Sequence, residues 1–457
     1  KGGNWPNAAN INPAAFVDGL FQTHLYDGTG SAQTITNNID FTKGGLIITK
    51  RRDSSTGNGP YWNDTERGVT NYIRSDSDGG TGAQNTSSTG AVVSTSSTGY
   101  VVGTFNGWNN SSGEYVSWTF RKQPKFFDIV TYSGTGSNQN ISHNLGSVPG
   151  MILIKDTSAS NAWTVYHRGV DSSAPEDYSL NLGSDAARDD ATSYFNDTAP
   201  TSSVFTVGTT ARTNNNGSTY VAYLFAHNND DGGFGEPGDQ DIIKCGSYTG
   251  NTSGTEVNLG FEPQFVMIKK SSASESWYVY DSMRGVATGG ANSQDKKLRW
   301  NSTGAEGAVA SPIIAFSANG FILESTDNEI NGSGTYVYMA IRRGGMQTPT
   351  TPSDVFAINV RSSSDGEGKY TSGFPVDFSI AKVYDETGNF FAGTRLINQH
   401  LQTNDDVTAG SSASDYEWDH NDGVSIGASG AFFGSSKDII NYMWKRARGY
   451  FDVLTYT

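Results

Sequence analysis

The sequence predicts an all-β protein, organised as a tandem array of four antiparallel β-sandwich domains of the jelly-roll or lectin-like type. Three observations support this class: short alternating or apolar runs recur along the chain, turn-forming residues separate them, and the same motifs return four times. Only 35% of the residues are hydrophobic and 17% are charged, so Gly, Ser, Thr and Asn fill the difference. Disordered chains have many charges and few aromatics, whereas 12% of this chain is aromatic.

The predicted strands are short and are bounded by turn residues. Residues 203–208 (SVFTVG) alternate between polar and apolar, as in a half-buried strand. Residues 152–155 (ILIK) form a short apolar run that suits a strand buried on both faces. Turns rich in Asn and Gly precede the tyrosine-rich strands, at residues 109–113, 214–218 and 331–334.

Three motifs recur in the same order and define the repeat. The first is an aromatic strand, which reads YVSWTF (115–120), YVAYLF (220–225), YVYMAI (336–341) and INYMWK (440–445). The second is an apolar strand that ends in lysine, which reads GLIITK (45–50), GMILIK (150–155), QFVMIK (264–269) and DFSIAK (377–382). The third is Arg-Gly-Val at 67–69, 168–170 and 284–286, of which only Arg395 remains in the fourth copy. In this alignment His167 corresponds to Glu66 and Met283.

The copies are spaced about 95–115 residues apart, which is long enough for each to hold its own core. The predicted domains are residues 1–124, which include an N-terminal lead-in, 125–235, 236–348 and 349–449, and residues 450–457 begin a fifth copy. We therefore expect the natural protein to continue past Thr457. Because the sequence starts at Lys1 with neither an initiator methionine nor an apolar signal region, we expect a processed start or a fragment.

Charge and cysteine content exclude several classes of partner and site. The chain has 31 Lys and Arg against 46 Asp and Glu, and its net charge of −15 disfavours nucleic acids and anionic membranes. No apolar run approaches the ~20 residues that a membrane-spanning helix needs, so we expect no membrane insertion. Cys245, the one cysteine, can form neither an internal disulfide nor a cysteine-based zinc site.

No sequence motif of a catalytic or cofactor site is recognisable. None of the six histidines pairs with another at i, i+2 or i, i+4, and nucleophile-elbow, phosphate-loop and zincin motifs are missing. We therefore expect a non-enzymatic protein without a cofactor. A polysaccharide depolymerase stays as a less favoured alternative, because its two carboxylates, about 5–10 Å apart in space, leave no mark in sequence.

Two groups of side chains are candidates for ligand contact. The first lies in the linker between the second and third copies, at Asp230, Asp231, Asp239 and Asp241. Oxygen-rich loops suit calcium, but this spacing is not that of an EF-hand loop. A solvated linker is therefore favoured, and calcium binding is left open.

The second group comprises Tyr61, Trp62 and Trp108, which are aromatic residues near turns. Such rings either stack on the sugar rings of a glycan or pack inside a domain, and the sequence leaves both roles open. Trp118, Tyr223 and Trp444 belong to the repeated aromatic strands, so we expect them in the core.

Several long strings resemble a repeat found in tail-fibre or structural proteins of marine bacteriophages, cyanophages among them. These strings are YVSWTFRK (115–122), NLGSVPG (144–150), NDTAPTSSVF (196–205) and YVAYLFAH (220–227). The segments MWKR (443–446) and GYFD (449–452) fit the same pattern. The resemblance covers nearly the whole chain and is weakest over residues 1–20.

The resemblance implies a non-enzymatic virion protein, a tail fibre or appendage that helps the particle attach to its host. By analogy it also implies a homo-oligomer, with a trimer favoured, contacts with other virion proteins, and a host surface glycan as a possible ligand. It transfers no role to particular residues. The alternative from the residues themselves is a cell-surface adhesin or extracellular filament of carbohydrate-binding modules.

Overall fold

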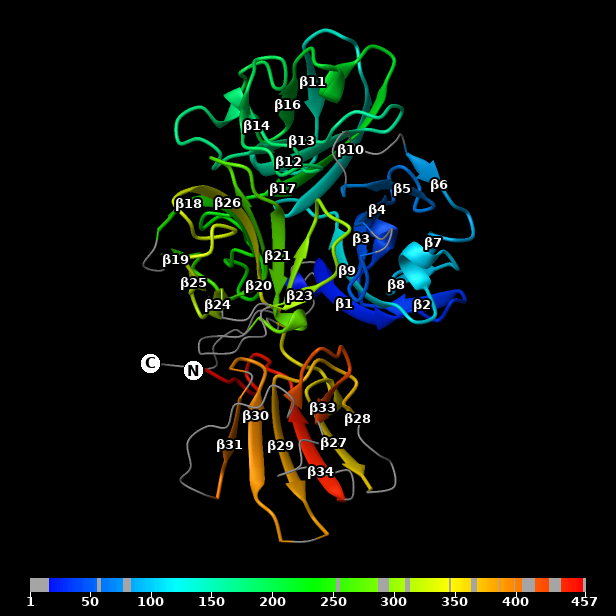
Figure 1. Cartoon of the computed structure of the whole chain (residues 1–457), viewed down its shortest axis with the longest axis vertical. Coiled ribbons are helices and arrows are strands. Elements are labelled where there is room, and N and C mark those ends of the chain that lie inside the picture. The colour runs from blue at the N-terminus through cyan, green and yellow to red at the C-terminus, as the bar shows by residue number, and fades with distance from the viewer. Residues whose placement is uncertain are drawn as a thin grey trace, which may run out of the picture.

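The computed structural model of the chain confirms the all-β class (Figure 1). Strands account for 45% of the chain and form several antiparallel sheets. The helices of the described residues are α1 (Asn106–Asn109) and α2 (Ala211–Asn214), each of one turn, and none is long or apolar enough to cross a bilayer. The structure describes residues 16–55, 59–76, 84–251, 255–286, 296–308, 313–344, 347–362, 368–385, 387–397, 399–404, 416–426 and 437–454.

Four large sheets share one strand order. In each, the first strand of a repeat unit pairs with the last, the last with the third, and the third with the fourth. Large sheet 1 contains β1 (Phe21–Asp27), β9 (Glu114–Arg121), β3 (Gly45–Arg51), β4 (Tyr61–Asp64), β5 (Asn71–Arg74) and β6 (Asn85–Thr86). Large sheet 2 contains β10 (Phe127–Ser133), β17 (Thr219–Ala226), β12 (Pro149–Asp156) and β13 (Thr164–His167). Large sheet 3 contains β18 (Ile243–Gly250), β26 (Gly334–Arg342), β20 (Pro263–Lys270), β21 (Trp277–Asp281), β22 (Lys296–Arg299) and β23 (Gly307–Ala308). Large sheet 4 contains β27 (Phe356–Arg361), β34 (Ile439–Trp444), β29 (Phe378–Val383), β30 (Phe390–Thr394) and β31 (Gln399–Gln402).

Each unit also has a small sheet. These contain β2 (Gln33–Thr36), β8 (Gly99–Val102) and β7 (Val92–Thr95) in unit 1, and β11 (Gln139–Ser142) and β16 (Val204–Val207) in unit 2. They contain β19 (Thr255–Asn258), β25 (Gly320–Leu323) and β24 (Ile314–Ser317) in unit 3, and β28 (Gly368–Thr371), β33 (Gly423–Ile426) and β32 (Tyr416–Glu417) in unit 4. The remaining elements are the ribbon β14 (Tyr178–Ser179)–β15 (Asp189–Asp190) and the 3-10 turns η3 (Val17–Gly19), η4 (Phe41–Lys43), η5 (Pro175–Asp177), η6 (Ser282–Arg284) and η7 (Pro352–Asp354).

Apolar side chains fill the space between the large and small sheets. Units 1, 3 and 4 each have a hydrophobic cluster there, around Ile47, Val266 and Ala381 respectively. The division of the chain into four sandwich domains at the predicted boundaries stays a prediction.

Units 1, 2 and 3 form a triangle, with their large sheets turned toward one another (Figure 1). One hydrophobic cluster contains buried residues of all three large sheets, because the strands of these sheets are apolar on both faces. Aromatic rings from different units meet in it: Trp62 lies 5.2 Å from both Trp163 and Trp300, and Phe120 lies 5.2 Å from Phe225. We call this arrangement the three-sheet ring. The predicted core positions Trp118 and Tyr223 are buried in it. The expectation was wrong for Trp444, which is only half-buried because it lies on the face of β34 that points away from the core of unit 4.

Polar contacts join the units of the ring, and in each contact the last strand of one unit meets the fourth strand of another. The Tyr223 hydroxyl of unit 2 donates to Asp64 of unit 1 at 2.7 Å. The Trp118 indole of unit 1 donates to Asp281 of unit 3 at 3.1 Å. His167 of unit 2 bonds through Nε2 to the carbonyl oxygen of Tyr338, in unit 3, at 3.0 Å. Each unit therefore touches both others through its fourth strand and its last strand, and the ring is closed.

His167 occupies the position that an aspartate holds in the other two units. Strand register pairs Leu46 with Asp64, Met151 with His167 and Phe265 with Asp281. The two aspartates form ion pairs with the arginine three residues later, which is Arg67 or Arg284. Unit 2 is two residues shorter at this turn, so the alignment of His167 with Glu66 and Met283 is wrong. Its histidine makes a neutral junction instead of an ion pair.

Units 1 to 3 each lock their first and last strands with two tyrosines and one buried asparagine. The rings of Tyr132 and Tyr220 stack at 5.0 Å, and the equivalent pairs Tyr26–Tyr115 and Tyr248–Tyr336 stack at 5.2 and 5.1 Å. In unit 2 the amide of Asn214 accepts from the Thr135 nitrogen at 2.8 Å and donates to the Gly208 oxygen at 2.7 Å. The first asparagine of each predicted turn is therefore a buried staple, which explains why it recurs.

Replacement of this asparagine should destabilise the protein strongly. Asn214→Ala removes the acceptor of the Thr135 backbone N–H and the donor to the buried Gly208 carbonyl oxygen, which we expect to lower the free energy of unfolding by about 2–4 kcal/mol. Asn216→Ala, at an exposed position of the same turn, should change it by about 0.5 kcal/mol or less. Denaturant titration of both variants tests this, and equal effects would contradict the staple.

Acid should weaken the junction between units 2 and 3. Burial lowers the pKa of His167 to about 3, below the ordinary 6.5, so the unfolded chain takes up a proton that the folded chain refuses. Stability should therefore fall as the pH drops from 6.5 toward 3, by about 1.4 kcal/mol per pH unit for this group.

Denaturant titrations at pH 7 and pH 5 measure this loss, which we expect to be smaller in His167→Gln than in the wild type. The variant keeps the contributions of His24 and His227, whose pKa values burial lowers to about 4. An unchanged loss in His167→Gln would show that this junction does not sense acid.

Candidate functional site

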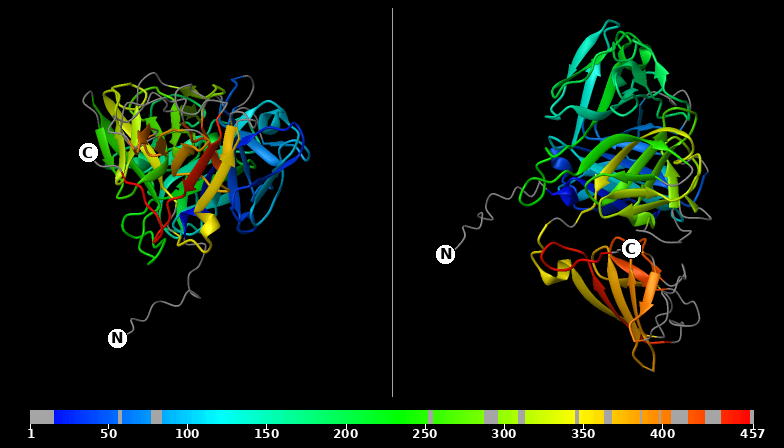
Figure 2. Two further views of the ribbon diagram at one scale, coloured as in Figure 1. Left: turned by 90° about the horizontal axis from the view of Figure 1, so that it is seen from below. Right: turned by 90° about the vertical axis from the view of Figure 1, so that its left-hand side faces the viewer.

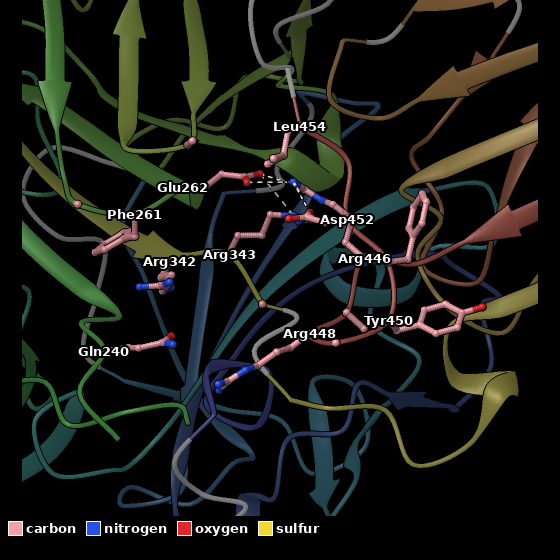
Figure 3. Close-up of a pocket in the computed structure, with 16 residues that line it drawn as sticks. Gln240, Phe261, Glu262, Arg342, Arg343, Arg446, Arg448, Tyr450, Asp452 and Leu454 are labelled. Atoms are coloured by element: carbon pink, nitrogen blue, oxygen red, sulfur yellow. Dashed lines mark hydrogen bonds and ion pairs between the residues drawn. The ribbon is translucent and has the colours of Figure 1, made fainter. Parts of the chain in front are cut away.

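A cleft of about 670 Å³ lies where unit 4 meets unit 3 (Figure 3). One wall is the end of β26 with the turn before β20, and the other wall is the segment that follows β34. The side chains labelled in the close-up are Gln240, Phe261, Glu262, Arg342, Arg343, Arg446, Arg448, Tyr450, Asp452 and Leu454. Four arginines thus gather in one cleft of a chain whose net charge is −15.

The repeat itself places two of these arginines. In register, Trp444 lies opposite Phe378 as Ile341 lies opposite Phe265, so Arg446 follows β34 at the position where Arg343 follows β26. Both therefore leave the end of a last strand. Because unit 4 joins unit 3 through these strand ends, the two guanidinium groups face the same carboxylates.

Two carboxylates bind these arginines. Glu262 accepts from both terminal nitrogens of Arg446, at 2.7 and 3.1 Å, and lies 3.6 Å from Arg343 Nε. Asp377 of unit 4 bonds to the Arg343 side chain and accepts from the backbone nitrogen of Arg446 at 2.7 Å. Burial opposes the charge of Asp377, but Arg343, Arg446 and Arg395 outweigh it and lower the pKa of the carboxyl.

Of the third sequence motif, unit 4 has only Arg395, and this side chain contacts both unit 4 and unit 3. Its Nε donates to the Val376 oxygen at 3.0 Å, and its Nη1 reaches the Ser282 oxygen of unit 3 at 3.4 Å. The motif therefore keeps only the arginine, which now joins unit 4 to the ring.

Arg342 differs from the other arginines of the cleft. Its guanidinium lies over the ring of Phe261 at 5.9 Å and contacts the backbone oxygen of Asp241 at 3.4 Å. No ion pair of Arg342 occurs among the residues that the structure describes. Burial lowers its pKa, because the carboxylates of Asp241, Asp239 and Glu262 offset only part of the desolvation of the charge.

The rim of the cleft has apolar and aromatic side chains beside the charged Arg448 and Asp452. Tyr450 is 47% exposed and Leu454 is 69% exposed, so both offer surface to a ligand. A guanidinium forms paired hydrogen bonds with a carboxylate, and aromatic rings stack on sugar faces. The cleft therefore suits a small ring compound that has a carboxylate group.

The aromatic residues predicted for ligand contact lie elsewhere. Tyr61, Trp62 and Trp108 are buried, and the rings of Tyr61 and Trp108 pack 4.0 Å apart beneath the small sheet of unit 1. Trp62 belongs to the shared core of the ring. These positions argue for packing, the other role that the sequence leaves open, because no ring face of the three reaches solvent.

The acidic linker is a loop in which aspartate side chains accept hydrogen bonds from backbone nitrogens of the same loop. Asp241 accepts from the backbone nitrogens of Asp230 and Gly232, at 2.9 and 3.1 Å, and Asp231 accepts from Asn229 at 2.9 Å. Asp239 lies nearby in the same loop. No group of three or more metal-ligating side chains is found in the described part of the chain.

The lysine that ends the second sequence motif is buried in each unit of the ring. Lys50 donates to the Ser302 oxygen at 2.8 Å and Lys269 to the Asp185 oxygen at 3.0 Å, so both reach into a neighbouring unit, whereas Lys155 bonds within unit 2. Burial lowers the pKa of Lys50 to about 7 and those of Lys155 and Lys269 to about 8. The sequence shows that this lysine recurs, but only the packing shows that Lys50 and Lys269 join neighbouring units.

The junction at Asp377 should hold unit 4 against the ring. Asp377→Asn removes the buried charge that faces Arg343, Arg395 and Arg446, and we expect a loss of about 3–5 kcal/mol in the stability of this junction. Asp422→Asn is the matched control, because it removes the exposed pair with Lys369 and should cost about 1 kcal/mol or less.

Limited proteolysis of the connector between β26 and β27, with thermal unfolding, compares the two variants. Faster cleavage in Asp377→Asn alone is the expected result. Equal cleavage would show that the cleft carboxylates do not hold the unit.

One family profile matches residues 18–343, and that family is described as a domain of unknown function (DUF7483). The match begins just before β1 and ends just after β26, so it covers the three-sheet ring and stops short of unit 4. A comparison with curated proteins finds no match. Because the matched residues make up more than half of the 457, the chain belongs to the family of the domain of unknown function DUF7483.

Proposed function

We propose that the chain is a structural and attachment protein of a phage virion, a segment of a tail fibre or appendage, and that the cleft at Arg342 binds a short acidic saccharide of the host surface. In this proposal the four units are tandem β-sandwiches, each built from a large and a small sheet. The protein acts without covalent chemistry, in the extracellular particle.

The observation that supports the structural role most directly is the closed three-sheet ring. Its recurring polar residues, such as Asp64, His167, Asp281 and the buried lysines, bond to the neighbouring unit or to backbone atoms. A chain that uses its repeated polar groups to join its own units suits a structural part. The resemblance of its repeats to those of phage fibres points to the same role.

The observation that supports attachment is Arg342 beside Phe261, with Tyr450 at the rim of the same cleft. Long polyanions are disfavoured by the net charge of −15, so the suited ligand is a terminal or short acidic sugar. A cell-surface adhesin would use the same cleft, and immunogold labelling of virions and cells separates the two proposals.

Loss of Arg342 should weaken binding to acidic saccharides. Arg342→Gln removes the charge that pairs with the ligand carboxylate, and we expect about a 10-fold or greater increase in Kd for uronic acid oligosaccharides, measured by calorimetry. Arg168→Gln, an exposed arginine of unit 2, is the control and should bind like the wild type.

An equal Kd for Arg342→Gln and the wild type would show that the oligosaccharide does not bind in this cleft. Shortening of the oligosaccharide during the same assay would contradict the non-enzymatic role and favour a depolymerase.

A further inference from the structure

Large sheet 4 presents to solvent the face that the other three large sheets bury in the ring. One row of side chains crosses this face in register, through Ile358, Tyr442, Ile380, Ala392 and Leu401. The neighbouring rows add Phe356, Val360, Phe378, Lys382, Phe390, Ile440 and Trp444. We call these twelve positions the open face, and Lys382 is its one charged residue.

The equivalent positions of the ring are buried. Ile358 is 52% exposed, whereas Ile129 and Cys245 stand at the same place in large sheets 2 and 3 and are buried. Leu401 is 49% exposed, whereas its equivalent Leu298 is buried.

The same contrast holds at a third position. Phe390 is 38% exposed, and its counterparts are the buried Trp163 and Trp277. Monomeric proteins rarely leave so continuous an apolar patch in water.

We propose that two further copies of this chain cover the open face, so that three copies of large sheet 4 pack around a threefold axis as large sheets 1 to 3 pack within the chain. The partners are two further copies because the ring shows how three such faces bury one another in a shared core. The same strand order, with apolar residues at the same positions, closes in threes and leaves no face exposed. The proposal stands whether or not the chain attaches to a host.

Lys382 fits the same packing. It stands at the position of Lys50 and Lys269, which donate to backbone oxygens of a neighbouring unit in the ring. Within one chain the Lys382 ammonium lies over the Phe390 ring at 4.8 Å. A neighbouring copy would supply a backbone oxygen as acceptor for the Lys382 ammonium, as neighbouring units do for Lys50 and Lys269.

Unit 4 can offer this face because it is attached by one end. Its junction with the ring runs through Asp377, Arg395 and Arg446, and through Asn421, which bonds to the backbone of Leu25. In Figure 2 (right) unit 4 stands below the ring, and its strands run away from it. The ring therefore does not cover the flat side of large sheet 4.

Mass photometry and light scattering of the full chain test the proposal. We expect a trimer in the wild type and a monomer in Ile358→Asp, because a buried, unpaired carboxylate should weaken association by about 100-fold or more. Val148→Asp, which adds the same charge at a residue of unit 2 that is 51% exposed, should stay trimeric.

Leu401→Asp, on the far side of the open face, should act like Ile358→Asp, and circular dichroism checks that each variant is folded. A monomeric wild type at high micromolar concentration would overturn the proposal, as would a dimer. A trimer that survives both aspartate variants would also overturn it, because another surface would then join the copies.

Discussion

A sheet that is apolar on both faces needs two partners, and this constraint governs the whole molecule. In units 1, 3 and 4 the small sheet covers one face of the large sheet. The second face of large sheets 1 to 3 cannot remain in water, because each buried apolar side chain contributes about 1.5–3 kcal/mol that exposure would forfeit. Three such sheets satisfy one another around a shared core, and this explains why the units are arranged in a triangle.

Polar groups decide how the three sheets meet. Burial of an unpaired charge or hydrogen-bonding group is costly, so the polar side chains that bond between units favour the one arrangement in which they meet their partners. Asp281 meets both Arg284 and the Trp118 indole, and His167 meets the backbone of Tyr338. The apolar surfaces supply cohesion, and these contacts set the register between units.

Much of the fold follows from local patterns, whereas the site does not. The repeated strands, the four-fold recurrence and the core positions Trp118 and Tyr223 can be read from alternation, apolar runs and turn residues. The ring cannot, because an apolar run such as residues 152–155 predicts a strand covered on both faces but does not show what covers it. Trp62 lies near a turn in sequence, yet the packing between units places it in the core.

Charged residues show the same limit. Arg342 and Arg343 are adjacent in sequence, but only the seam between units 3 and 4 shows that Arg343 forms an ion pair with Asp377 whereas Arg342 lies over the Phe261 ring. The two-residue deletion before Arg168 hides the equivalence of His167 and Asp64, because a gap in a turn is invisible until strand register is known. Contacts between units depend on distances that no local spacing encodes.

The closed ring has a consequence for how the sequence can diverge. Three identical chains around an axis must place the same residue at every equivalent position. Three units of one chain need not, and here Trp118, Tyr223 and Met339 occupy one equivalent position with different side chains. Because the three units belong to one chain, each can have different residues at its contacts. Unit 2 contacts unit 3 through a histidine, and unit 3 contributes arginines to a cleft.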